Sequence, residues 1–153
     1  MLNNKLNFER ICELIPNWNW NELKFGYDKS IIANNEIISY AMLILSEDID
    51  QFDRVLELAI ANDSEVEEIL KKLTLDKDIQ DLTKINSKWI FAIIYDAYIN
   101  LNDRVYEVIE DVYSEFEYPE EISNLIGYMS NNDCRPMDMK LNEYIKINKD
   151  IWC

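Results

Sequence analysis

The chain has 153 residues and a formal net charge of −15, from 15 Lys and Arg against 30 Asp and Glu. This charge disfavours non-specific binding to nucleic acids and anionic membranes, and it favours cationic partners. The sequence contains no His, which removes the most common general base and the most common metal ligand. With only 2 Gly and 3 Pro, the composition also argues against a turn-rich all-β fold.

Apolar periodicity and capping signals predict an all-α protein, with about eight helices in a single domain over residues 1–153. In the first half, a connector rich in aromatic residues is expected over 16–27. Ser64 and Glu67 have the spacing of a capping box at the start of a helix. The helices expected in this half cover residues 6–15, 28–45, 47–61 and 64–73.

The second half follows a polar connector over residues 74–84. Ser87 is expected to cap a strongly apolar helix. Pro119 suits the first position of a later helix, because its missing amide hydrogen has no partner there anyway. The helices expected in this half cover residues 87–101, 102–116, 119–129 and 139–151.

A weak internal repeat runs through this pattern. Residues 53–57 (Asp-Arg-Val-Leu-Glu) resemble residues 103–107 (Asp-Arg-Val-Tyr-Glu), and the helices that follow them have similar apolar spacing. Two three-helix repeats, at about 30–74 and 86–130, would stack on one another as in an α-solenoid. Helical packing without duplication is the alternative.

Nearly all of the net charge lies in two segments. The first acidic segment, residues 46–68, has nine Asp and Glu against Arg54. The second acidic segment, residues 103–121, has eight against Arg104. They occupy equivalent places in the proposed repeat, so stacked halves would join them in one acidic face. Concentrated like charge costs stability, which a protein tolerates more readily when a partner uses it.

This acidic face is a candidate docking surface for a cationic protein, and a solvated surface without a partner is the alternative. Tyr106 and Tyr113 lie seven residues apart on one side of the same expected helix. Tyrosines often anchor interfaces, although these two could equally be edges of the core. The predicted partner-binding residues are Asp50, Asp53, Glu57, Asp103, Tyr106, Glu107, Glu110, Asp111, Tyr113 and Glu115.

Catalytic patterns are weak. Glu107 and Asp111, four residues apart, have the spacing to bind Mg²⁺ or to divide acid and base roles. The Glu67-Glu68 pair lacks the third Glu that all-helical nucleotide pyrophosphatases place next, because Lys71 stands there. Residues 76–81 resemble a calcium loop without its Gly and its final Glu.

The three cysteines, Cys12, Cys134 and Cys153, are scattered and include no C-x-x-C pair. Without His they make no credible zinc site, and we expect reduced thiols. We therefore expect no enzyme, no cofactor and no metal site, and keep a carboxylate-based, metal-dependent enzyme as an alternative.

The N-terminal residues 1–10 lack the apolar core of a signal peptide. The longest apolar stretch, residues 37–45, is interrupted by Ser39 and is far shorter than the roughly 20 residues that span a bilayer. We expect a cytoplasmic protein that does not bind membranes and is a monomer on its own.

Several motifs resemble those of a known family. They are residues 116–122 (Phe-Glu-Tyr-Pro-Glu-Glu-Ile) with Tyr128-Met129, and Trp20-x-x-Leu23-x-x-Gly26 with Ile38, Tyr40 and Ala41 downstream. Together they resemble an uncharacterised all-helical bacterial family of about this length. In size, acidity and lack of catalytic residues the chain is also similar to immunity proteins of bacterial toxin systems, including contact-dependent growth inhibition.

That second resemblance implies a cytoplasmic protein that binds and blocks one cognate toxin domain, commonly a cationic nuclease. The leading hypothesis is therefore a non-enzymatic inhibitor that neutralises a basic toxin through its acidic face, without binding nucleic acid itself. A nucleic-acid mimic that blocks a DNA- or RNA-binding protein is the main alternative.

Overall fold

The computed structural model describes residues 6–74, 82–127 and 134–153. These residues form helices and no strand, which confirms the all-α prediction. The chain forms two compact units: residues up to Pro16 together with those from Asn86 onward make unit 1, and Asn17–Ile85 make unit 2. No helix in the described part of the chain combines the length and hydropathy that crossing a membrane requires.

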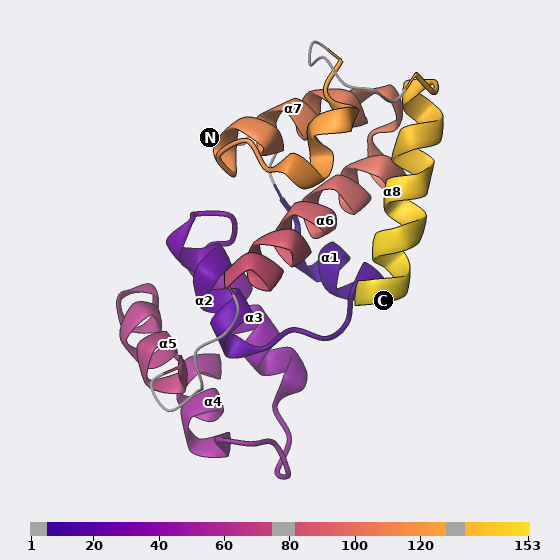
Figure 1. The fold of residues 1–153 in the computed structure, drawn as a ribbon. Helices are drawn as coiled ribbons and strands as arrows, with labels where there is room; N and C mark the ends of the chain where they lie inside the picture. The colour runs from indigo at the N-terminus through magenta and orange to yellow at the C-terminus, as the bar shows by residue number, and fades with distance from the viewer. Residues whose placement is uncertain (1–5, 75–81, 128–133) are drawn as a thin grey trace. The chain divides into compact units, whose positions relative to one another are not determined.

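Unit 2 contains α2 (Trp20–Asp28), α3 (Asn34–Ile44), α4 (Phe52–Ala59), the 3₁₀ turn η1 (Asp63–Glu65) and α5 (Val66–Thr74). Figure 1 shows α4 and α5 side by side; α4 packs against α3, and α5 packs against both α2 and α3. Tyr40 on α3 fixes the chain before α2, because its hydroxyl donates to the Trp18 carbonyl at 3.0 Å. Its ring also meets that of Trp20 edge to face, with centroids 5.7 Å apart.

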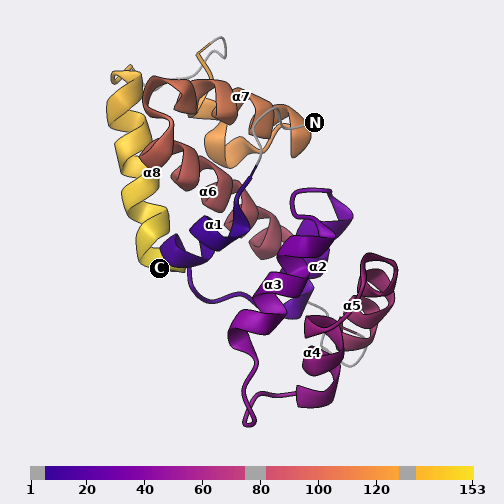
Figure 2. The ribbon, with the colours of Figure 1, turned by 180° about the vertical axis from the view of Figure 1, so that it is seen from behind.

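Unit 1 contains α1 (Phe8–Leu14), α6 (Leu82–Asn100, most of it in this unit), η2 (Asn102–Arg104), α7 (Val105–Glu115), η3 (Glu120–Leu125) and α8 (Met137–Trp152). Ten consecutive residues of α6, 88–97, are buried, so the middle of this helix is covered on every side, whereas its first and last three residues are exposed. Figure 2 shows the same elements from behind, with α7 and α8 on either side of α6.

Side chains from three directions close around α6. The Phe8 ring of α1 lies 5.8 Å from the Trp89 ring, and the Tyr144 ring of α8 lies 6.0 Å from that of Phe91. From η3, the Glu121 carboxylate accepts a hydrogen bond from the Ser87 hydroxyl at 3.0 Å. The strongly apolar sequence of α6 therefore forms the centre of the core of unit 1.

A partly buried ion pair also links α1 to α6. Arg10 donates from Nε and Nη2 to the two carboxylate oxygens of Asp96, at 2.6 and 2.8 Å. The Asn100 amide donates to the same carboxylate at 3.0 Å. Because the Asp96 side chain is only 7% exposed, these donors replace the water that the carboxylate loses on folding.

The helices expected over 28–45 and 47–61 begin later than predicted, α3 at Asn34 and α4 at Phe52. Ser30 and Gln51 adopt positive φ angles, which an α-helix does not contain.

Four further details differ from the sequence-based expectations. A helix, α2, stands where a connector was expected, started by a capping box of Asn19 and Glu22. The capping contact before α5 lies at Asn62 rather than at Ser64 and Glu67: the Glu65 carboxylate accepts from the Asn62 N–H at 3.2 Å, and the Ser64 hydroxyl donates to Asn62 Oδ1 at 2.6 Å. The helix expected from Ser87 begins earlier, at Leu82, so Ser87 lies inside α6 and donates to Glu121 instead.

The fourth difference is the segment after Pro119, which forms the short 3₁₀ helix η3 rather than an α-helix to residue 129. Residues 128–133, at the end of that expected helix, lie outside the described residues. The proposed repeat at 30–74 falls in unit 2, and the one at 86–130 falls in unit 1. Whether the two arose by duplication, and whether 1–153 is one domain, stay predictions.

Candidate partner-binding surfaces

The negative charge is shared almost equally between the two units. Unit 2 has 15 Asp and Glu against 7 Lys and Arg, a net −8, and unit 1 has 15 against 8, a net −7. The first acidic segment lies wholly in unit 2 and the second wholly in unit 1. Each unit therefore has an acidic surface of its own, and a single joined face stays a prediction.

In unit 1 the acidic surface is the outward side of α7. Its inward side buries five residues in the core: Val105, Val108, Ile109, Val112 and Tyr113. Of the predicted residues, Asp103, Glu107 and Glu110 are exposed, whereas Asp111 and Glu115 are half-buried. No large apolar side chain of α7 is exposed, and the structure describes this helix completely. The outward side is therefore a charged surface without an apolar centre.

Arg104 lies next to this acidic surface and neutralises little of its negative charge. Arg104 Nε lies 3.8 Å from Glu107 Oε2, and both side chains are well exposed, at 61% and 72%. Such a pair in water contributes little to stability and is easily exchanged for another partner. Glu107 therefore stays available to an incoming cation.

The two predicted tyrosine anchors differ in their burial. Tyr106 is half-buried, and its pKa is raised by burial and then by the charges of Asp138 and Asp103. Tyr113 is only 6% exposed and belongs to the core. The exposed ring is that of Tyr118, which meets Tyr113 edge to face at 5.3 Å and is 65% exposed. Tyr118 is a candidate contact that sequence reasoning missed.

In unit 2 the acidic surface includes the outward side of α4. The helix buries Val55, Leu58 and Ala59. Asp53 and Glu57 are exposed on the helix, and Asp50 is exposed in the turn before it. Two apolar side chains share the outward side, Leu56 at 37% and Ile60 at 77% exposed. These two were not among the predicted partner-binding residues, although their spacing from Asp53 places them on the same face.

Arg54 is the one base of the first acidic segment, and its guanidinium points toward α5. It donates from Nη1 to the Lys72 carbonyl at 2.7 Å and to the Gln51 side chain at 3.1 Å. A cation suits this place, because the carboxyl end of a helix carries partial negative charge. Asp53 and Glu57 take part in no ion pair with any described residue. Their charges therefore face solvent.

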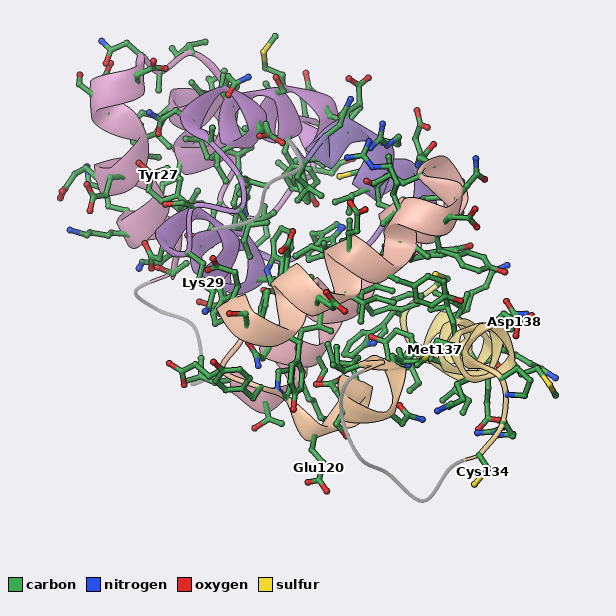
Figure 3. All side chains as sticks on the ribbon, turned by 90° about the horizontal axis from the view of Figure 1, so that it is seen from above. Tyr27, Lys29, Glu120, Cys134, Met137 and Asp138 are labelled. Carbon is green, nitrogen blue, oxygen red and sulfur yellow. The ribbon has the colours of Figure 1, made fainter. Side chains whose placement is uncertain are left out.

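The acidic surface of unit 2 continues to η1 and α5. The hydroxyl of Tyr27 on α2, labelled in Figure 3, is affected by the charges of this surface. The pKa of Tyr27 is raised by burial and then by the charges of Glu67, Asp28 and Asp63. In each unit, then, a tyrosine hydroxyl lies in a negative field.

Cys12 lies in an environment that disfavours its thiolate. All three cysteines are free, and burial, followed by the charge of Glu9, raises the pKa of Cys12 to about 11. The Cys12 thiol is thus protonated at neutral pH, whereas a reactive cysteine needs the thiolate. Among the described residues, no group of three or more Cys, Asp or Glu side chains is arranged to hold a metal ion.

The Glu121 carboxyl group predicts a pH dependence of stability. Burial raises its pKa above the ordinary 4.5, while the hydrogen bond from Ser87 acts in the opposite direction. A raised folded-state pKa means that the folded state holds the proton more tightly, so stability falls as pH rises from about 4.5 through the raised value. Glu121→Gln should therefore stabilise the protein above that window and lose the advantage below it.

Urea unfolding of both proteins between pH 4 and pH 8 measures this. Glu120 and Glu121 are both exposed, but Glu121 accepts the hydrogen bond from Ser87, whereas its neighbour Glu120 points away from η3 (Figure 3), so Glu120→Gln is the matched control. A stabilisation by Glu121→Gln that did not change with pH would contradict the assignment.

The fold and these surfaces define an all-helical protein with an acidic surface on each of two units. Residues 9–149 match the model of a family described as uncharacterized proteins conserved in bacteria (DUF2247). The match covers most of the chain, so the protein belongs to this family, as the motif resemblance predicted. No curated protein and no solved structure matches the chain.

Proposed function

We propose that the protein is a non-enzymatic inhibitor, an immunity protein that binds and neutralises a cationic bacterial toxin domain. The main support is the placement of the charge. Two segments with net charges of −8 and −7 hold exposed carboxylates along helices of the two units. The resulting self-repulsion costs stability, and a cationic partner would relieve it.

The proposed mechanism is electrostatic capture followed by occlusion. Complementary charge raises the rate at which two proteins meet and sets their orientation. A nuclease domain has a basic groove for its phosphate substrate, and carboxylates on a rigid helix are suitable occupants of that groove or its rim. Asp103, Glu107 and Glu110 on unit 1, with Asp53 and Glu57 on unit 2, are the carboxylates best exposed for this role.

A pull-down tests the proposal. The tagged protein is incubated with lysate of the bacterium that encodes it, washed in rising salt, and the eluted proteins are identified by mass spectrometry. We expect one basic protein that is retained at low salt and released at high salt. Purified, it should show a toxin activity that the protein abolishes at equimolar ratio. Retention of no basic protein would count against the proposal.

The identity of the captured protein separates the two inhibitor hypotheses. A toxin supports the immunity function. A DNA- or RNA-binding protein that duplex DNA displaces from the bait would instead support nucleic-acid mimicry.

A further inference from the structure

The outward side of α4 alternates between acidic and apolar side chains. Positions 53, 56 and 57 are spaced i, i+3 and i+4 on one face of the helix, and Ile60, the C-cap residue directly after α4, continues this spacing at i+7. We call Asp53, Leu56, Glu57 and Ile60 the α4 stripe. All four side chains are exposed, Ile60 at 77%. The stripe combines apolar area that gains from burial with two carboxylates that have no ion-pair partner in the described chain.

This combination distinguishes α4 from α7. Both helices expose carboxylates, but α7 exposes no large apolar side chain. Interfaces owe most of their affinity to a dehydrated apolar centre, whereas charges at the rim mainly increase the association rate. The α7 surface is therefore equipped to attract a cationic partner, and the α4 stripe is equipped to hold one.

The chemistry of the stripe restricts its occupant. A purely apolar partner would bury Asp53 and Glu57 without a counter-charge, which is costly. A purely charged partner would leave Leu56 and Ile60 in water. Resting on the proposed function, we infer that the α4 stripe docks a cationic amphipathic helix of the partner, in which apolar residues lie between Lys or Arg residues.

Helix α8 provides an internal comparison. Ile147 and Ile151 are also four residues apart and exposed, at 53% and 61%. The charges around them are balanced, with Lys146 and Lys149 against Glu143 and Asp150. This pair matches the apolar part of the α4 stripe without its net negative charge, and it lies in the other unit.

Two labelled peptides test the inference. One is a helical Leu/Lys peptide with an apolar face, and the other has the same length and charge with Ser in place of Leu. In fluorescence anisotropy the protein should bind the Leu/Lys peptide about tenfold more tightly, because only this peptide covers Leu56 and Ile60. The preference should persist at high salt, which screens the charges that the two peptides share.

Matched variants locate the effect. Leu56→Gln with Ile60→Gln should abolish the preference, whereas Ile147→Gln with Ile151→Gln should keep it. Thermal melts followed by circular dichroism establish that both variants fold. Amide chemical shifts in the wild-type complex should change around residues 52–61.

Three outcomes would overturn the inference. The first is equal binding of the two peptides by the wild type, and the second is a preference that survives the α4 substitutions. The third is a set of shift changes confined to residues 103–115. Each leaves the proposed cationic partner intact. Binding of neither peptide would count against the proposed function as well.

Discussion

Replacing Arg10 by Met should destabilise the protein by roughly 3 kcal/mol, because it leaves the buried Asp96 carboxylate with the Asn100 amide in place of three donors. Removing one partner of a buried pair usually costs about 3–5 kcal/mol. We expect the low end of that range because the Arg10 side chain is 38% exposed, so water can enter its place. Urea unfolding followed by circular dichroism at neutral pH measures the change.

The matched control is Lys24→Met. Lys24 and Asp28 form an ion pair of similar length, 2.6 Å, but within one helix and with exposures of 31% and 51%. Its loss should cost only about 0.5 kcal/mol. Adding Asp96→Leu to Arg10→Met should recover stability, since an apolar pair leaves no buried charge. If Arg10→Met and Lys24→Met lowered the free energy of unfolding by equally small amounts, the ion pair between α1 and α6 would contribute no more to stability than an exposed pair.

Reversing two charges on α7 should slow association with the cationic partner by at least about tenfold at low salt. The change is Glu107→Lys with Asp111→Lys, two residues on adjacent turns of the outward side. The field that attracts a cation is strongest near the concentrated carboxylates, and the substitutions invert it there. Stopped-flow association rates with the captured partner, at low and high salt, measure the effect, which should shrink as salt screens it.

Glu9→Lys with Glu13→Lys is the control. These residues are also four apart and exposed, on α1, outside both acidic segments. The change in total charge is the same, so an equal slowing by both variants would mean that net charge matters and the α7 surface does not. An unchanged rate for the α7 variant would show that the surface assignment is wrong.

The spacing of apolar residues along the sequence predicted most of the helices, because this spacing depends only on residues that are close together in the chain. It predicted α7 and α8 to within about two residues at most ends. It missed α2, where Trp18, Trp20 and Phe25 looked like a connector, although Asn19 and Glu22 hold a capping signal. It extended the segment after Pro119 too far, because apolar spacing alone does not distinguish an α-helix from a 3₁₀ helix such as η3.

The sequence by itself determined the helical class, the net charge and the two segments that carry it, since composition and periodicity need no fold. Only the tertiary structure decided which side chains are exposed. Tyr113 is in the core and Tyr118 covers it. Arg54 points to the end of α5 rather than shielding Asp53 and Glu57. Leu56 and Ile60 remain exposed. Exposure depends on what packs against a helix face, and those neighbours come from distant parts of the chain.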